Sequence, residues 1–132
     1  MENSDIWKVI NKYFEENPQA LVRHHIESYN DFFKNGGVGL NVTVPFKGLA
    51  YNLCDELDQS AGLCKSVNTV LIDSGKLIGH STDGQGLIDD FLHKEITLED
   101  SKILIIGAGG SAASIISSLL FHGKIKEISI LN

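Results

Sequence analysis

The chain has 132 residues, of which 11 are basic and 17 acidic, and its formal net charge is −6 with the histidines neutral. A length of this order corresponds to about one domain. The hydrophobic share of 42% and the charged share of 21% are ordinary for globular proteins, which excludes a fibrous repeat and wholesale disorder. The net acidity argues against nucleic-acid binding as the main function of the chain.

The longest apolar runs, such as residues 103–106, are far shorter than the roughly 20 residues that a membrane helix requires. The charged start Met1-Glu2-Asn3 resembles no secretory signal. We therefore expect a cytoplasmic protein that binds no membrane. In that reducing compartment Cys54 and Cys64 are expected to remain reduced.

Two amphipathic helices are predicted at the start of the chain. Apolar residues recur at helical spacing between residues 6 and 14, and again between residues 21 and 33. Asn17-Pro18 separates the two patterns, and the pair Gly36-Gly37 ends the second.

From residue 38 onward, short β-branched runs alternate with helical patterns. This alternation predicts an α/β fold with parallel strand pairing. A polar stretch at residues 94–101 predicts a domain junction. The predicted strands are residues 40–44, 67–72, 103–106 and 127–131, and the predicted helices are residues 47–57, 84–93 and 111–122.

A glycine-rich turn follows the most apolar of these strands. Residues 103–106 run directly into Gly107-Ala108-Gly109-Gly110-Ser111-Ala112 and then into an apolar helix. Glycines let the backbone approach a ligand closely, so the amides at the helix start can face a pyrophosphate. The dinucleotide-binding pattern is only partly kept, because Ala112 takes the place of its third glycine. A purely structural turn is the alternative, and Ser111 is expected to cap the helix or contact phosphate.

Polar residues cluster in two further segments. Residues 41–47 place alternating polar side chains on one face of a predicted strand, and Pro45 ends that strand and presents Lys47 at its carboxyl edge, where α/β ligand clefts form. Asn68 lies where a loop ends and another predicted strand opens, and Asp83 lies in a turn before a helix. Taken singly, these residues are explained as a solvated lysine, a turn former and a helix cap.

Taken together and in this order, the motifs at residues 41–47, 67–69, 81–84 and 107–112 resemble the shikimate dehydrogenase family, over about residues 33–132. The resemblance implies a substrate domain facing a Rossmann-like NADP domain. It implies NADP-dependent interconversion of 3-dehydroshikimate and shikimate, a step of aromatic amino acid biosynthesis, or a related reaction of quinate. The implied catalytic residues are Lys47 and Asp83, the implied substrate contacts are Asn41, Thr43 and Asn68, and the implied cofactor contacts are Gly107, Ala108, Gly109, Gly110, Ser111 and Ala112.

The chemistry of these side chains agrees with the resemblance. Oxidation of a secondary alcohol needs a group that takes the hydroxyl proton, and a lysine anchored by a carboxylate can relay it. Amides and hydroxyls such as those of Asn68 and Thr43 both donate and accept hydrogen bonds, which suits a polyol. A neighbouring carboxylate favours the charged lysine while desolvation opposes it, so the sequence leaves open the sign of any pKa shift in the pair.

The chain departs from the family pattern at several points. It has no opening strand with the family's SxSP loop, Lys65 stands where the family has a glycine before its VNT loop, and Ser81 replaces an asparagine. Past Asn132 the family would continue with the basic residues that select NADP, further strands and a glutamine-bearing segment. We therefore expect an exposed sheet edge that requires a partner, such as a second copy in a homodimer. An inactive fragment or chimeric remnant remains the alternative to an enzyme.

The first segment has a different resemblance. Residues 21–32, with the helical pattern before them, resemble the amino-terminal helices of the second-largest subunit of multisubunit RNA polymerases, over about residues 5–33. That resemblance implies no catalytic residue, and chance similarity of two amphipathic helices is the alternative. Together the two resemblances divide the chain into a helical segment (residues 1–33), a partial substrate-binding domain (34–100) and the start of a Rossmann-like domain (101–132).

No metal site is predicted. His24 and His25 are adjacent on a helix, where neighbouring side chains diverge, and no Cys or His follows at ligand spacing. Cys54 and Cys64 form no CxxC pattern, and packing is their expected role.

Overall fold

A computed structural model describes residue 16 and residues 18–132 of the chain. The chain divides into two compact units, residues 1–37 and residues 38–132. The helix predicted between residues 6 and 14 lies outside the described residues. Within the described ranges, no helix is both long enough and apolar enough to cross a membrane.

The first unit contains the helix α2 (Pro18–Lys34). Proline suits a first helical position, where its missing N–H would have no helical acceptor. At the other end, the Gly37 N–H donates to the Phe32 carbonyl (3.0 Å) and the Gly36 N–H donates to the Phe33 carbonyl (3.1 Å). Gly36 has a φ of +88°, which glycine adopts without steric cost. The predicted second helix and its end at the glycine pair are therefore confirmed.

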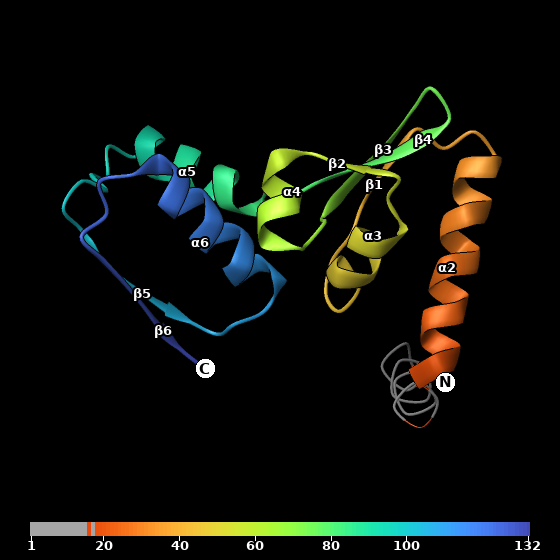
Figure 1. Cartoon of the computed structure of the whole chain (residues 1–132), viewed down its shortest axis with the longest axis horizontal. Coiled ribbons are helices and arrows are strands. Elements are labelled where there is room, and N and C mark those ends of the chain that lie inside the picture. The colour runs from red at the N-terminus through yellow and green to blue at the C-terminus, as the bar shows by residue number, and fades with distance from the viewer. Residues whose placement is uncertain (1–15, 17) are drawn as a thin grey trace, which may run out of the picture. The chain divides into compact units, whose positions relative to one another are not determined.

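The second unit contains a four-stranded mixed sheet (Figure 1). In spatial order its strands are β1 (Gly39–Asn41), β3 (Thr69–Asp73), β4 (Lys76–His80) and β2 (Glu56–Leu57). The pairs β1–β3 and β3–β4 are antiparallel, and the pair β2–β4 is parallel. Ser74 and Gly75 both have positive φ angles (50° and 79°), which suits a two-residue hairpin turn. Parallel pairing, which the alternation of elements predicts, is thus only part of this sheet.

Two short helices, α3 (Lys47–Leu53) and α4 (Gln59–Cys64), contact strand β4. The helix predicted over residues 47–57 is too long, because Cys54 is extended and residues 56–57 pair with β4 as strand β2. The Asp58 carboxylate then caps α4 by accepting from the Ala61 N–H (2.8 Å). Neither α4 nor β4 was predicted, and the strand predicted over residues 40–44 ends at Asn41. Pairing with a distant strand overrides local helix propensity here.

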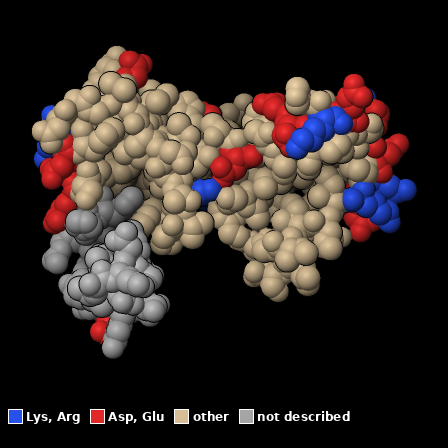
Figure 2. Space-filling model, turned by 180° about the vertical axis from the view of Figure 1, so that it is seen from behind, with Lys and Arg blue, Asp and Glu red and all other residues tan. Residues whose placement is uncertain are grey.

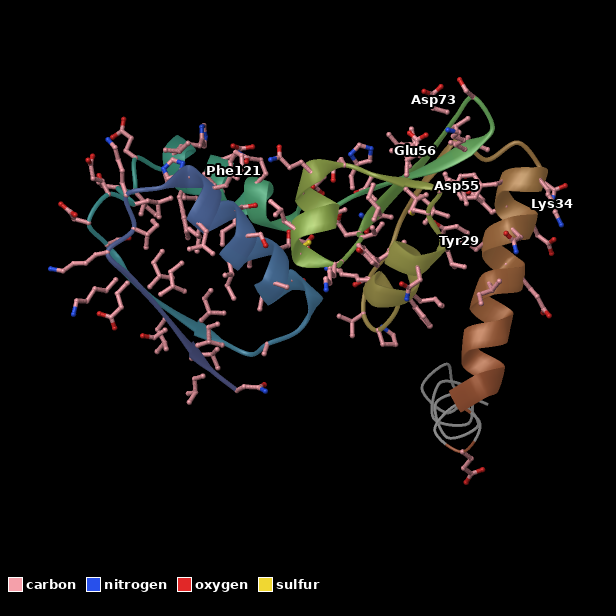
Figure 3. The ribbon with its side chains drawn as sticks, viewed as in Figure 1. Tyr29, Lys34, Asp55, Glu56, Asp73 and Phe121 are labelled. Carbon is pink, nitrogen blue, oxygen red and sulfur yellow. The ribbon has the colours of Figure 1, made fainter. Side chains whose placement is uncertain are left out.

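The core of this sheet region is built from small and β-branched side chains. Ala50, Ala61, Val67 and Val70 are each fully shielded from solvent, at 0% exposure. Figure 3 labels Glu56, which lies on the short edge strand β2. Its exposed carboxylate accepts from Lys76 of the neighbouring strand β4 (2.5 Å). Because such exposed pairs contribute little to stability, the buried apolar residues hold this region together.

Lys65 follows α4 in the left-handed conformation, with φ 53° and ψ 39°. A Cβ makes this conformation unfavourable, whereas glycine adopts it freely. The sequence left open what a lysine does at this family glycine position, and the backbone keeps the conformation that suits glycine.

We expect Lys65→Gly to raise the free energy of unfolding by about 0.5–1 kcal/mol, measured by urea denaturation. Lys102→Gly, within a strand, should lower it, and a loss of stability in Lys65→Gly would contradict the expectation.

The remaining elements form a strand–helix–strand unit with a preceding helix. They are α5 (Asp83–His93), β5 (Lys102–Ile106), α6 (Gly110–His122) and β6 (Glu127–Leu131). Strands β5 and β6 are parallel, as predicted. Helices α5 and α6 lie side by side on one face of this pair (Figure 1). Their shared core contains Ile88, Leu98 and Leu119, with Ile103, Ile105 and Ile128 of the strands packed against it.

The opposite face of the β5–β6 pair is open to solvent and carries three exposed apolar side chains beside polar ones. Leu104 is 62% exposed, Ile106 78% and Leu131 59%. Parallel sheets in proteins are normally covered on both faces, so this face is the place where further structure would pack. The polar stretch predicted as a junction, residues 94–101, is the connection between α5 and β5, and Leu98 within it is buried in the core.

Candidate active site

A lysine and an aspartate from different helices meet inside the second unit. Lys47 is the first residue of α3 and Asp83 is the first residue of α5. The Lys47 ammonium donates to Asp83 Oδ2 and forms an ion pair with it, and the two side chains are only 10% and 26% exposed. Lys47 is therefore not a solvated lysine. Asp83 is not the cap of α5 either, because Thr82 holds that position.

Asn68 holds the other oxygen of the carboxylate. Its Nδ2 donates to Asp83 Oδ1 (2.6 Å) and to Thr82 Oγ1 (3.0 Å), and its Oδ1 accepts from the Thr82 N–H (3.0 Å). Asn68 is only 5% exposed. Because both amide N–H donors are engaged, Asn68 in this arrangement orients Asp83.

The other two predicted substrate contacts lie on the surface. Asn41 is exposed, and its Nδ2 donates to the Asn68 carbonyl (2.8 Å), which fixes the backbone next to the site. Thr43 is exposed beyond the end of β1, in a turn where its carbonyl accepts from the Phe46 N–H (2.9 Å). The strand predicted over residues 40–44 is therefore too long, because only residues 40 and 41 belong to β1. Asn41 and Thr43 are nevertheless both exposed while Val42 between them is buried, as the alternation predicts.

The glycine-rich turn joins β5 to α6 as predicted. Gly107 has a φ of +106°, and Gly109 is the residue from which α6 starts, its carbonyl accepting from Ala113 N–H (3.0 Å). Ala108 and Gly109 are exposed, and a Cβ on Gly109 would meet no atom within 4 Å. Free N–H groups at the start of a 13-residue helix, reached over an open glycine backbone, can receive an anionic phosphate.

Gly110 brings the same turn against the lysine. A Cβ there would lie 2.6 Å from Ser66 Oγ and 3.4 Å from Lys47 Cδ. A Cβ at this position would therefore displace the Ser66 hydroxyl and make an ordinary contact with the lysine. The turn that sequence analysis assigned to a cofactor therefore packs directly on the lysine assigned to catalysis.

Of the two roles expected for Ser111, helix capping is wrong and contact with phosphate stays a prediction. Its hydroxyl does not cap α6, because no side-chain cap hydrogen bond is present at this helix start. Instead Ser111 Oγ accepts from Lys47 Nζ (2.8 Å) and donates to Asp83 Oδ2 (3.0 Å). The sequence carries no signal for this contact, since 64 residues separate Ser111 from Lys47.

Two further serines, which sequence reasoning did not assign to the site, join α5 to α6. Ser81 Oγ donates to Ser114 Oγ (2.8 Å), and the Gly84 N–H donates to the same Ser114 oxygen (3.1 Å). Ser81 and Ser114 are 3% and 2% exposed. The serine that replaces the family asparagine thus anchors the turn that carries Asp83. The only sequence signal was the run of small residues at the start of α6.

The surroundings of Asp83 set its protonation. Partial burial raises its pKa, but hydrogen bonds from Lys47, Ser111 and Asn68 and the charge of Lys47 lower it more, so its pKa falls below the ordinary value of 3.8. The sequence left open the sign of any pKa shift in the pair, and for the Asp83 carboxylate the shift is downward. Asp58 has a lowered pKa as well: burial raises it, and hydrogen bonds from Ala61, Ser60 and His80 outweigh that effect.

This lowered pKa predicts an acid-dependent loss of stability. Because Asp83 binds a proton less readily in the folded chain than in the unfolded one, its stabilising contribution is complete above pH 3.8 and is lost as the pH falls through its folded-state pKa. We expect the free energy of unfolding to fall less steeply below about pH 4 in Asp83→Asn than in the unsubstituted chain. Urea denaturation at a series of pH values measures the two slopes, and equal slopes would contradict the assignment.

Within the described residues, no group of three or more His, Cys, Asp or Glu side chains could hold a metal ion. Cys54 and Cys64 are not joined by a disulfide.

Comparison with known proteins gives a consistent result. Residues 9–70 match the family model described as shikimate dehydrogenase substrate binding domain. Over 105 residues the chain is 48% identical to shikimate dehydrogenase (NADP(+)) of Acinetobacter baumannii (strain ACICU), covering 80% of this chain and 40% of the relative. It is 46% identical over 114 residues to the enzyme of the same name from Vibrio campbellii, covering 86% of this chain and 41% of the relative. The chain thus spans about two fifths of the length of these curated relatives.

Solved structures agree. The crystal structure of shikimate 5-dehydrogenase from Listeria monocytogenes, in complex with shikimate and NAD, superposes with a TM-score of 0.70 at 36% identity, covering 79% of this chain and 36% of that one. The ligand-free 5-ketofructose reductase of a Gluconobacter species superposes with a TM-score of 0.68 at 34% identity, covering 80% of this chain and 37% of that one. The same fold is therefore found in proteins named for different substrates.

Proposed function

The family match and the curated relatives support placing this chain in the shikimate dehydrogenase family, and on that premise we propose that it carries the proton-transfer half of an NADP-dependent oxidoreductase site. The proposed reaction is the interconversion of 3-dehydroshikimate and shikimate, with quinate as the alternative substrate. The observation that carries the proposal is the partly buried Lys47–Asp83 pair, which lies next to the glycine-rich turn.

Each residue has a defined task in this proposal. In the reducing direction the Lys47 ammonium donates a proton to the carbonyl oxygen of the substrate, and Asp83 keeps the ammonium in place. Asn68 orients the carboxylate through its 2.6 Å hydrogen bond. Asn41 and Thr43 are exposed and are proposed to contact substrate hydroxyl or carboxylate groups.

The glycine-rich turn is proposed to hold the cofactor. Its open backbone at Ala108 and Gly109 and the start of α6 suit a pyrophosphate, as does the positive φ of Gly107. NADP, when bound, supplies hydride exchange with the substrate carbon. Gly110 and Ala112 would contribute backbone and small side chains to the same turn. Because the Ser111 hydroxyl is engaged with Lys47 and Asp83, its share in cofactor binding is proposed to be its N–H.

The division into a helical segment (residues 1–33), a partial substrate-binding domain (34–100) and the start of a Rossmann-like domain (101–132) stays a proposal. The polymerase resemblance of residues 5–33 also stays a prediction, and the family match from residue 9 onward covers most of that segment. Cytoplasmic location and a homodimer are likewise proposed. On the face that Figure 2 shows, the described Lys side chains are scattered among acidic ones, which does not favour a nucleic-acid partner.

The test is whether the purified 132-residue chain oxidises shikimate with NADP⁺. The reaction is monitored through the absorbance of the reduced nicotinamide that forms. We expect activity that is lost in Lys47→Ala, because the proton-transfer group is removed. A folded chain without activity would contradict the proposal and favour the alternative, an inactive fragment or chimeric remnant. Repeating the assay with quinate and with NAD⁺ decides between the substrates and between the cofactors.

A further inference from the structure

The Ser111 hydroxyl stands between the two charged groups of the site. It comes from α6, whereas Lys47 comes from α3 and Asp83 from α5, so one hydroxyl connects three helices. An ammonium can only donate hydrogen bonds and a carboxylate can only accept them. The distances of 2.8 Å to Lys47 Nζ and 3.0 Å to Asp83 Oδ2 therefore fix the direction of the hydroxyl proton, which points to the carboxylate.

The neighbouring residue strengthens this connection. Gly110 lies next to the aliphatic part of the lysine, since a Cβ on it would be at ordinary packing distance, 3.4 Å, from Lys47 Cδ, while the Ser111 hydroxyl accepts from the ammonium. An alanine at position 111 would keep the packing and remove only the hydroxyl. One acceptor of Lys47 and one donor of Asp83 would then be lost.

From this geometry we propose that Ser111 is a positioning residue. Its hydroxyl holds the Lys47 ammonium and the Asp83 carboxylate at a fixed position relative to the glycine-rich turn. The inference rests on the proposed function, because the position of the two charged groups relative to the turn matters when a proton is exchanged beside a bound cofactor. Lys47 is the charged group that faces Asp83, and the other two contacts, Asn68 and Ser111, are neutral. Loss of the Ser111 hydrogen bond should therefore be visible in the titration of Asp83 itself.

The experiment follows the Asp83 carboxyl carbon by NMR through an acid titration of the 132-residue chain. Ser111→Ala should raise the pKa of Asp83, because a hydrogen bond to the charged form is removed. Ser111→Thr keeps a hydroxyl and should titrate like the unsubstituted chain. Ser117→Ala, on the same helix, is the matched control and should also leave the titration unchanged.

The outcomes separate this inference from the proposed function. An unchanged Asp83 titration in folded Ser111→Ala would overturn it, and so would a shift in folded Ser111→Thr or an equal shift in Ser117→Ala. If the chain oxidises shikimate, Ser111→Ala should lower kcat about tenfold with little change in KM. A shifted titration in a chain without activity would leave the positioning role supported and count against the proposed function alone.

Discussion

Replacing Gly84 with alanine should lower the free energy of unfolding by about 3 kcal/mol, because there is no room for a methyl group where α5 meets α6. A Cβ on Gly84 would lie 2.3 Å from the Ser114 carbonyl oxygen and 2.4 Å from Ser118 Oγ. The carbonyl belongs to the helix backbone and cannot rotate away. The two helices would have to separate, which would also break the hydrogen bond from the Gly84 N–H to Ser114 Oγ. Urea denaturation measures the loss.

Gly86 provides the matched control in the same helix. A Cβ on Gly86 meets no atom within 4 Å, so alanine there adds only helix propensity. We expect Gly86→Ala to raise the free energy of unfolding by roughly 0.5–1 kcal/mol. Equal effects of the two substitutions would show that the close approach of α5 and α6 does not limit the residue at position 84.

Replacing Lys47 with methionine should lower the free energy of unfolding by about 2 kcal/mol, because it leaves a largely buried carboxylate without its charged partner. The Asp83 side chain is only 26% exposed, so water compensates for the lost ammonium in part. Methionine fills much of the volume of the lysine stem, which separates the charge effect from a cavity effect. The same variant should lack shikimate oxidation under the proposed function.

The double variant Lys47→Met/Asp83→Asn tests the origin of this cost. Removing both charges removes the unpaired carboxylate, so most of the lost stability should return while activity stays absent. A double variant as unstable as the sum of the two single variants would mean that the groups do not interact, and the pair would then not be the centre of the site.

Local signals in the sequence were sufficient for several elements. The end of α2 follows from the glycine pair after it, and the β5–turn–α6 unit follows from an apolar run, three glycines and an apolar helix pattern. In each of these cases the residues that determine the structure are neighbours in the chain. The parallel pairing of β5 with β6 could be predicted for the same reason, because a short helical connection leaves few alternatives.

Elements whose partners are distant could not be read from local patterns. Residues 56–57 continue a helical pattern, yet they pair with β4 about 20 residues later as strand β2. Strand β4 itself depends on the turn Ser74-Gly75, and the sequence analysis did not identify that turn. Lys65 keeps a left-handed conformation that its own side chain disfavours, because the surrounding fold determines it.

By itself the sequence determined which residue types the site contains: a lysine, an aspartate, an amide and a glycine-rich turn in a defined order. The tertiary structure alone decided that these groups meet, that the pair is partly buried, and that Ser111 contacts both of its charges. The physical reason is separation along the chain, since 36 residues separate Lys47 from Asp83 and 28 more lead to Ser111. Only the packing of α3, α5 and α6 removes that separation, and it brings to Asp83 the hydrogen bonds and the neighbouring charge that lower its pKa.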